Sequence, residues 1–221
     1  MNFTLIDLTH SLSPAIPIWD DSCGFEFKVG DNNDEVFMYT SSGTHIDAPS
    51  HFRTEEQTID KLELEQLCAA ACVIDVSDRA TADYVISAED MLAYEKTHGT
   101  IAENSLVIAL TGWSRHWGDV KAYRNADANG DLHYPSFSME AVVLLLKRGI
   151  VGIGIDTFSP ELICRSTSYP IHQLLFSKGK YIIENLANCH LLPPKGAHVI
   201  ALPLKILNGG EAPARVIALV P

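Results

Sequence analysis

The sequence predicts an α/β fold, and three apolar segments separated by helix signals carry this prediction. Residues 69–76, 106–110 and 150–155 are short runs of apolar residues, as is typical of strands buried on both faces. One helix is expected at 88–98, and a second is expected between Ser138 and Gly149. This alternation of strands and helices favours a sheet with helices packed against it.

Cap residues mark the ends of both helices. Ser87 followed three residues later by Asp90 is a capping-box start, and Gly99 is a typical residue for ending the helix that follows. Ser138 is an N-cap residue for the second helix, and Gly149 ends it. The boundaries of these helices therefore follow from local chemistry.

Two shorter helices are also expected. Asp60, with Glu63 three residues on, predicts a helix that begins with Asp60 as its N-cap. Pro170 opens the other helix, which runs to Ser177, because proline is well tolerated in the first turn.

The remaining apolar stretches predict four more strands. They are residues 3–8, 36–40, 198–204 and 215–220, of which the last two form a hairpin around Gly209-Gly210. No internal repeat, low-complexity tract or linker divides the chain. Residues 1–221 are therefore expected to form a single domain.

Composition excludes several classes of partner. The net charge of −12 argues against nucleic acid, because phosphate binding needs clustered lysine and arginine. No apolar run reaches the roughly 18 residues that a membrane span needs, and no signal peptide is apparent at the N-terminus. Five cysteines without a C-x-x-C spacing are typical of reduced thiols. We expect a cytoplasmic protein that acts on a small molecule.

A cluster of chemically active residues lies in the segment 40–52. In an extended segment, positions 45, 47, 49 and 51 point to one face, because side chains alternate along a strand. His45, Asp47 and His51 would then converge as nitrogen and oxygen ligands of a divalent metal. From this spacing alone, a polar strand edge with three unrelated side chains is an equal alternative.

Two further residues are candidates from their surroundings. Glu184 follows two isoleucines, and a buried carboxylate needs a partner, which a metal ion or a salt bridge can supply. Trp19 lies in a proline-rich loop, where it either lines a pocket for a flat substrate or anchors the loop on the core.

Ordered motifs along most of the chain resemble one known family. Residues 41–51 match the signature H-x-G-T-H-x-D-x-P-x-H at Gly43, Thr44, His45, Asp47, Pro49 and His51. Further blocks match at Asp7–His10, Pro17–Trp19, Thr111–Trp113, Gly154–Thr157, Pro170–His172, Ile182–Leu186 and Ala201–Lys205. The set resembles the cyclase family of metal-dependent hydrolases, which includes bacterial kynurenine formamidase and isatin hydrolase.

The resemblance implies both a fold and a division of roles. The fold is a compact domain of the swivelling β/β/α type that assembles as a homodimer or a higher homo-oligomer. The implied metal ligands are His45, Asp47, His172 and Glu184. His51 is implied as the proton-transfer residue, and Trp19 as part of the substrate pocket.

The sequence departs from the signature at its first position, where Ser41 replaces a histidine ligand. A serine hydroxyl is a poor zinc ligand compared with imidazole, and its short side chain leaves room for a water. We expect one divalent ion, zinc or manganese, rather than two, with Ser41 in at most weak or water-mediated contact.

The predicted function is metal-dependent hydrolysis of a small amide. A bound ion lowers the pKa of a water and polarises the carbonyl, while His51 transfers the proton. The first candidate substrate is an arylformamide such as N-formylkynurenine, and the second is a cyclic amide or lactone. The alternative is a metal-binding protein of this family with little or no hydrolytic activity, because its first motif ligand is Ser41.

Overall fold

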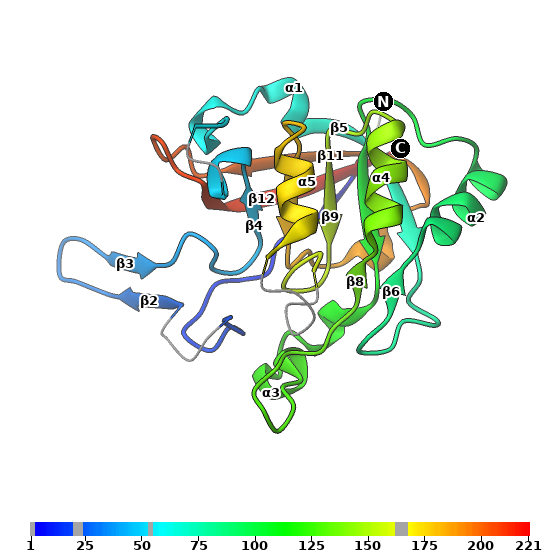
Figure 1. Ribbon diagram of the computed structural model, residues 1–221. Helices are drawn as coiled ribbons and strands as arrows, with labels where there is room; N and C mark the ends of the chain where they lie inside the picture. Colours follow the sequence, from blue (N-terminus) through cyan, green and yellow to red (C-terminus); the bar gives the residue numbers. More distant parts are fainter. Residues whose placement is uncertain (1–2, 20–23, 53–54, 162–167) are drawn as a thin grey trace.

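The central sheet of this protein returns to its own edge, so that it resembles a barrel (Figure 1). The structure is a computed structural model that describes residues 3–19, 24–52, 55–161 and 168–221. The sheet has eight strands in the order β1-β12-β11-β5-β7-β9-β10-β4. An additional pairing between β4 and β12 closes the sheet. The strands are β1 (Thr4–Asp7), β4 (His45–Asp47), β5 (Cys68–Asp75), β7 (Leu106–Leu110), β9 (Gly152–Ile155), β10 (Tyr181–Glu184), β11 (Lys195–Pro203) and β12 (Glu211–Val220).

Parallel pairs make up one part of the sheet, and antiparallel pairs complete it. Strands β5, β7, β9 and β10 pair in parallel, each with the next. Strand β4 pairs antiparallel with both β10 and β12. All five residues of β7 are buried, and alternate side chains enter two different apolar clusters. The expected strand at 106–110, buried on both faces, is confirmed.

Three helices pack on the outer face of this sheet. They are α2 (Ala88–His98), α4 (Met139–Lys147) and α5 (Pro170–Phe176). Side chains from all three, such as Met91, Leu145 and Leu175, share an apolar cluster with Ile74 and Val107 of the sheet. The second cluster lies on the other face and is formed mainly by the strands. This arrangement confirms the α/β class.

The cap predictions for the longer helices are confirmed. Ser87 accepts a hydrogen bond from the backbone N–H of Asp90, and the Asp90 carboxylate accepts one from the Ser87 N–H. Gly99 follows α2 with φ of 87°, a conformation that favours glycine. Ser138 caps α4 by accepting a hydrogen bond from the N–H of Ala141.

The helix predicted to begin at Asp60 is wrong in its start. Ile59–Lys61 forms a short 3-10 helix, and α1 (Leu64–Leu67) begins later, with Glu63 and Gln66 forming its capping box. The Asp60 carboxylate instead accepts hydrogen bonds from the Thr58 hydroxyl, at 2.7 Å, and from the backbone N–H of Asn208, at 3.0 Å. It is therefore engaged by the chain around it and does not cap a helix.

The remaining elements lie around the central sheet. Strands β2 (Phe25–Lys28) and β3 (Glu35–Met38) form a separate hairpin that projects from the body of the molecule (Figure 1). The others are β6 (Val85–Ile86), β8 (Ser136–Phe137), α3 (Val120–Arg124) and 3-10 turns at Pro49–His51, Trp113–His116 and Cys189–Leu191. Within the described ranges, we find no helix with the length and apolar character of a membrane span.

Candidate metal centre and active site

The pairing of β4 with β10 and β12 brings four acidic or imidazole side chains to one place. His45 and Asp47 are two residues apart on β4, so their side chains leave the same face of the strand. Glu184 on β10 is opposite His45, and Glu211 on β12 is opposite Asp47. The expected extended conformation at His45–Asp47 is thus confirmed, and the strand closure adds the acidic neighbours.

Helix α5 adds the second histidine. Tyr169 precedes the helix with φ of 49°, and Pro170 begins it, so His172 lies in the first turn. The ring of His172 is buried, and its Nε2 atom lies 3.6 Å from Oδ2 of Asp47 and 3.4 Å from Oε1 of Glu184. A residue far along the chain therefore completes the group on β4.

Each of the two predicted histidine ligands lies at the spacing of metal ligands from both predicted carboxylate ligands. Nε2 of His45 lies 3.3 Å from Oε2 of Glu184 and 3.5 Å from Oδ1 of Asp47. Ligand atoms about 2.1 Å from a tetrahedral zinc lie about 3.4 Å from one another. The side chains of Asp47, His172 and Glu184 form one potential metal-binding group, and all three are buried.

Two buried oxygens of this group lack a hydrogen-bond partner among the described residues. They are Oδ1 of Asp47 and Oε1 of Glu184. Leaving such atoms unpaired costs free energy that a cation can offset. The mixed nitrogen and oxygen donors suit zinc or manganese, so the residues fit a divalent ion.

The electrostatics of these four residues also favour a bound cation. Burial by itself would lower the pKa of His45, but the neighbouring Asp47 and Glu184 carboxylates raise it to about 10. Burial would likewise lower the pKa of His172, and Asp47, Glu161 and Glu184 raise it well above its ordinary value. The two carboxylates thus create a strongly negative potential that favours a cation between the imidazoles.

Neighbouring groups fix both rings so that Nε2 faces the centre. Nδ1 of His45 is 2.9 Å from the carbonyl oxygen of Gly43, which also accepts a hydrogen bond from the Asn185 side chain. Nδ1 of His172 is 2.5 Å from Oε2 of Glu161. Such outer partners orient metal-binding histidines. Sequence reasoning missed Glu161, because its loop carries no recognisable spacing to His172.

The backbone around His51 differs from the extended path that the spacing suggested. Strand β4 ends at Asp47, and Pro49–His51 forms a 3-10 turn. The prediction that position 51 continues the extended face is therefore wrong, and Pro49 in the first turn accounts for the change. The ring of His51 still reaches the site, with its centroid 6.5 Å from that of His172.

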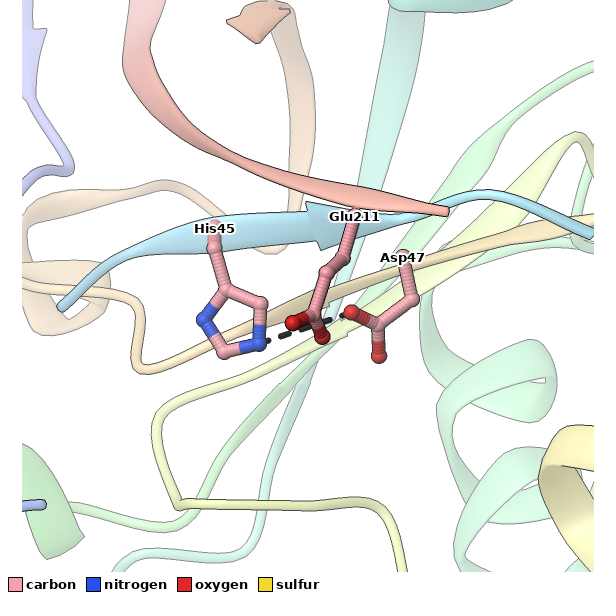
Figure 2. A group of neighbouring side chains, drawn as sticks. All are labelled: His45, Asp47 and Glu211. Atoms are coloured by element: carbon pink, nitrogen blue, oxygen red, sulfur yellow. Dashed lines mark ion pairs between the residues drawn. The ribbon is translucent and has the colours of Figure 1, made fainter. Parts of the chain in front are cut away.

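Glu211 is a second residue that sequence reasoning missed. Figure 2 shows its carboxylate pointing from β12 toward His45 and Asp47, whose ion pair is dashed. Ligand atoms of these three residues all lie within 4.8 Å of one another. Oε2 of Glu211 is 3.4 Å from Nδ1 of His51, and Oε1 accepts a hydrogen bond from the Thr40 hydroxyl.

An aromatic-walled cavity of about 420 Å³ opens onto these residues. It is lined by Pro17, Ile18, Trp19, Gly24, Tyr39, Ser41, Ser42, His45, Asp47, His51, Phe52, Phe158, Ser159, Tyr169, His172, Glu184, Asn185 and Glu211. Trp19 lies on the wall at 38% exposure, edge-on to Phe158. Ser41 lies on the wall and is exposed. All the predicted site residues therefore lie on one cavity.

The other two tryptophans serve the fold. The indole N–H of Trp113 donates a hydrogen bond to the carbonyl of Tyr123, inside a separate aromatic cluster. Trp117 stacks on His10, with ring centroids 4.0 Å apart. Neither lines the cavity, which takes its aromatic character from Trp19, Phe52, Phe158, Tyr39 and Tyr169.

The fold and this site define a small α/β protein with a buried histidine–carboxylate cluster that fits a divalent ion, and comparisons with known proteins identify its family. The family model described as "Putative cyclase" matches residues 6–162. The chain belongs to this cyclase family, and the family prediction is confirmed.

Three relatives illustrate the similarity. The chain is 38% identical to an isatin hydrolase from Roseibium aggregatum, over 81% of this chain and 72% of the relative. It is 29% identical to a kynurenine formamidase from Salinibacter ruber, over 96% of both chains. A crystal structure of an isatin hydrolase bound to the product analogue thioisatinate superposes with a TM-score of 0.91 at 30% identity, covering 99% of this chain and 93% of that one. The expectation of a hydrolase of this family is confirmed.

Proposed function

We propose that this protein hydrolyses the amide C–N bond of a small aryl amide, using one divalent ion held by His45, Asp47, His172 and Glu184. The observation that carries the proposal is the convergence of these four side chains, with two unpaired buried oxygens, at one cavity. The family relatives named isatin hydrolase and kynurenine formamidase support the same chemistry.

The ion supplies Lewis-acid chemistry, because a bound cation acidifies water and polarises a carbonyl oxygen. His51 takes the proton from the attacking water and returns it to the leaving nitrogen, which suits an imidazole. Its side chain is 27% exposed and lines the cavity, so it is accessible to a substrate there, whereas the proposed ligands are buried.

The cavity wall favours a flat substrate. Trp19 and Phe158 meet edge-on at 5.8 Å, and Phe52 stacks on Tyr169 with centroids 4.9 Å apart. Aromatic side chains of this kind pack against an aryl ring. A cyclic aryl amide comes first, because the similarity to isatin hydrolases is the stronger one. An arylformamide such as N-formylkynurenine is the second candidate.

The experiment is a substrate panel with metal-loaded and chelator-treated protein. The panel contains isatin, an N-formyl aryl amine and a small lactone, assayed after loading with zinc or with manganese. We expect hydrolysis of an aryl amide by the loaded protein and its loss on chelation. Bound metal without turnover of any panel member would reject the proposal and favour a non-catalytic metal-binding protein.

We also propose that two copies associate through the β2–β3 hairpin. Val29, Val36 and Phe37 expose 79%, 53% and 58% of their surface there, although large apolar side chains favour burial. Light scattering of Phe37→Ser should show a lower mass than wild type, whereas Leu64→Ser, which alters an exposed apolar residue on α1, should not. A monomeric wild-type protein would contradict this assembly.

A further inference from the structure

The carboxylate of Glu211 has different neighbours from Asp47 and Glu184, the other acids of the site. Glu211 is the first residue of β12 and lies directly opposite Asp47 on β4. Gly210, at the end of the loop between β11 and β12, precedes it. The side chain of Glu211 is 17% exposed and reaches the ring of His51, with Oε2 at 3.4 Å from Nδ1. It also lies near His45 and Asp47, so it could serve either the metal or His51.

The hydrogen bonds separate these two roles. The Thr40 hydroxyl donates a hydrogen bond to Oε1 of Glu211 at 2.6 Å, and Oε2 lies 3.4 Å from Nδ1 of His51. Asp47 and Glu184, in contrast, each keep one buried oxygen without a partner among the described residues. Unpaired oxygens mark the acids that a cation would satisfy. Glu211 differs from these acids, because a neutral hydroxyl holds one of its oxygens and its side chain is partly exposed.

The backbone holds Glu211 beside His51. The N–H of Ala48 donates to the carbonyl of Gly210 at 2.8 Å, which joins the start of β12 to the turn that carries His51. A Cβ atom at Gly210 would lie 2.9 Å from the Cα of His51, a distance that real Cβ atoms essentially never show. The absence of a side chain at Gly210 therefore permits the close approach.

We propose that Glu211 is the positioning residue of His51: it accepts the Nδ1–H hydrogen bond and so leaves Nε2 as the basic nitrogen. The partner of one imidazole nitrogen decides which nitrogen carries the proton. A carboxylate in this place also stabilises the imidazolium that forms when His51 takes a proton. The separation of 3.4 Å is long for a hydrogen bond, as is common in a site before substrate binds. The inference rests on the proposed function, in which His51 moves the proton.

The test combines three measurements on zinc-loaded protein, because manganese would broaden the NMR signals. They are metal content by mass spectrometry, kcat and KM for the best panel substrate, and the ¹⁵N resonances of the His51 ring, assigned with His51→Gln. The variants are Glu211→Leu, which has no acceptor, Glu211→Gln, which keeps an oxygen, and Thr40→Val, which frees Oε1. Glu65→Gln, an exposed carboxylate on α1, is the matched control.

In Glu211→Leu we expect unchanged metal content and KM, a roughly 10–100-fold lower kcat, and loss of the Nδ1-protonated form of His51. Glu211→Gln should retain part of kcat and part of the Nδ1-protonated form of His51. Thr40→Val should lower kcat and the fraction of this form, as Glu211→Leu does. Loss of metal in the Glu211 variants would make Glu211 a ligand and overturn the proposal. An unchanged His51 tautomer would overturn it as well.

The tautomer measurement needs no turnover. If wild-type protein hydrolyses no panel member, the proposed function fails, whereas the ¹⁵N comparison still decides whether Glu211 sets the protonation of the His51 ring. Should Glu211→Leu not fold, Glu211→Gln and Thr40→Val provide the same comparison with smaller changes in shape.

Discussion

Nδ1 of His172 and Oε2 of Glu161 lie 2.5 Å apart, and both side chains are buried. Oε1 of Glu161 also accepts a hydrogen bond from the backbone N–H of Ile171 at 2.7 Å. One carboxylate therefore fixes both the start of α5 and the orientation of the ring that this helix contributes. The Nε2 atom of His172 is thereby directed toward Asp47 and Glu184.

Removing the Glu161 carboxylate should weaken metal binding without removing a ligand. We expect Glu161→Gln to lower metal affinity by roughly 10–100-fold, because the His172 ring loses the charged group that orients it. Competition with a chromogenic chelator measures the affinity, and Glu65→Gln serves as the control. An affinity equal to that of wild type would show that the His172 ring is held by its packing alone.

Elements whose ends are set by neighbouring residues could be predicted from the sequence. Helix α2 spans the expected 88–98, because Ser87 and Gly99 define its ends locally. Strand β7 spans the expected 106–110, because an apolar run this short suits a strand covered on both faces. Strand β12, in contrast, begins at Glu211, earlier than the predicted 215. Its first residues are ordered by pairing with β4, a contact that only the closed sheet provides.

The same reasoning explains what was found and missed in the site. His45 and Asp47 share a strand face, so the period of two predicts their convergence. The places of Glu161 and Glu211 depend on how a loop meets α5 and how β12 meets β4. No spacing in the sequence encodes such long-range contacts. Pro49 is a local signal for the turn at His51, and the prediction of an extended segment did not take it into account.

We expect one equivalent of zinc or manganese per chain in protein purified without chelator. Both carboxylates are shared between His45 and His172, and Ser41 supplies no imidazole for a second ion. Elemental analysis by mass spectrometry gives the stoichiometry, and Asp47→Asn should abolish binding, because both histidines face this carboxylate. Two equivalents of zinc would contradict the single-ion proposal.

Replacing the proton-transfer residue should separate metal binding from turnover. We expect His51→Ala to keep its metal and to lose turnover by roughly 10²–10⁴-fold, because the ring lines the cavity beside the ligand group. His190→Ala, at an exposed histidine, is the matched control. Full activity of His51→Ala would remove this residue from the mechanism.

The wall residue Trp19 should affect substrate binding more than chemistry. Its indole lines the cavity and packs edge-on against Phe158 at 5.8 Å. We expect Trp19→Ala to raise KM for an aryl amide by roughly tenfold, with a smaller change in kcat. The reason is that the lost contact stabilises the bound substrate and the transition state to a similar extent. Trp117→Phe, outside the cavity, should leave KM as it is. A fall in kcat at constant KM would argue against this role.

His10 should make the protein less stable as the solution becomes acidic. Its ring stacks on Trp117, and its Nε2 atom is buried without a hydrogen-bond partner among the described residues. Burial lowers the pKa of His10 from 6.5 to about 4, although the carbonyl of Leu186 and the charge of Asp7 oppose this shift. The unfolded chain therefore binds this proton at a higher pH than the folded chain does.

The sign of the effect follows from this difference. As the pH falls from about 6.5 to about 4, protonation favours the unfolded chain, and the free energy of unfolding decreases by up to about 3 kcal/mol. Below about pH 4 both states are protonated, so His10 causes no further loss. His10→Phe keeps a ring for Trp117 but cannot titrate. Its urea unfolding should therefore lose less stability than wild type between about pH 7 and about pH 4.5, whereas His190→Gln should follow wild type. Equal losses in His10→Phe and wild type would show that His10 does not contribute to the acid sensitivity.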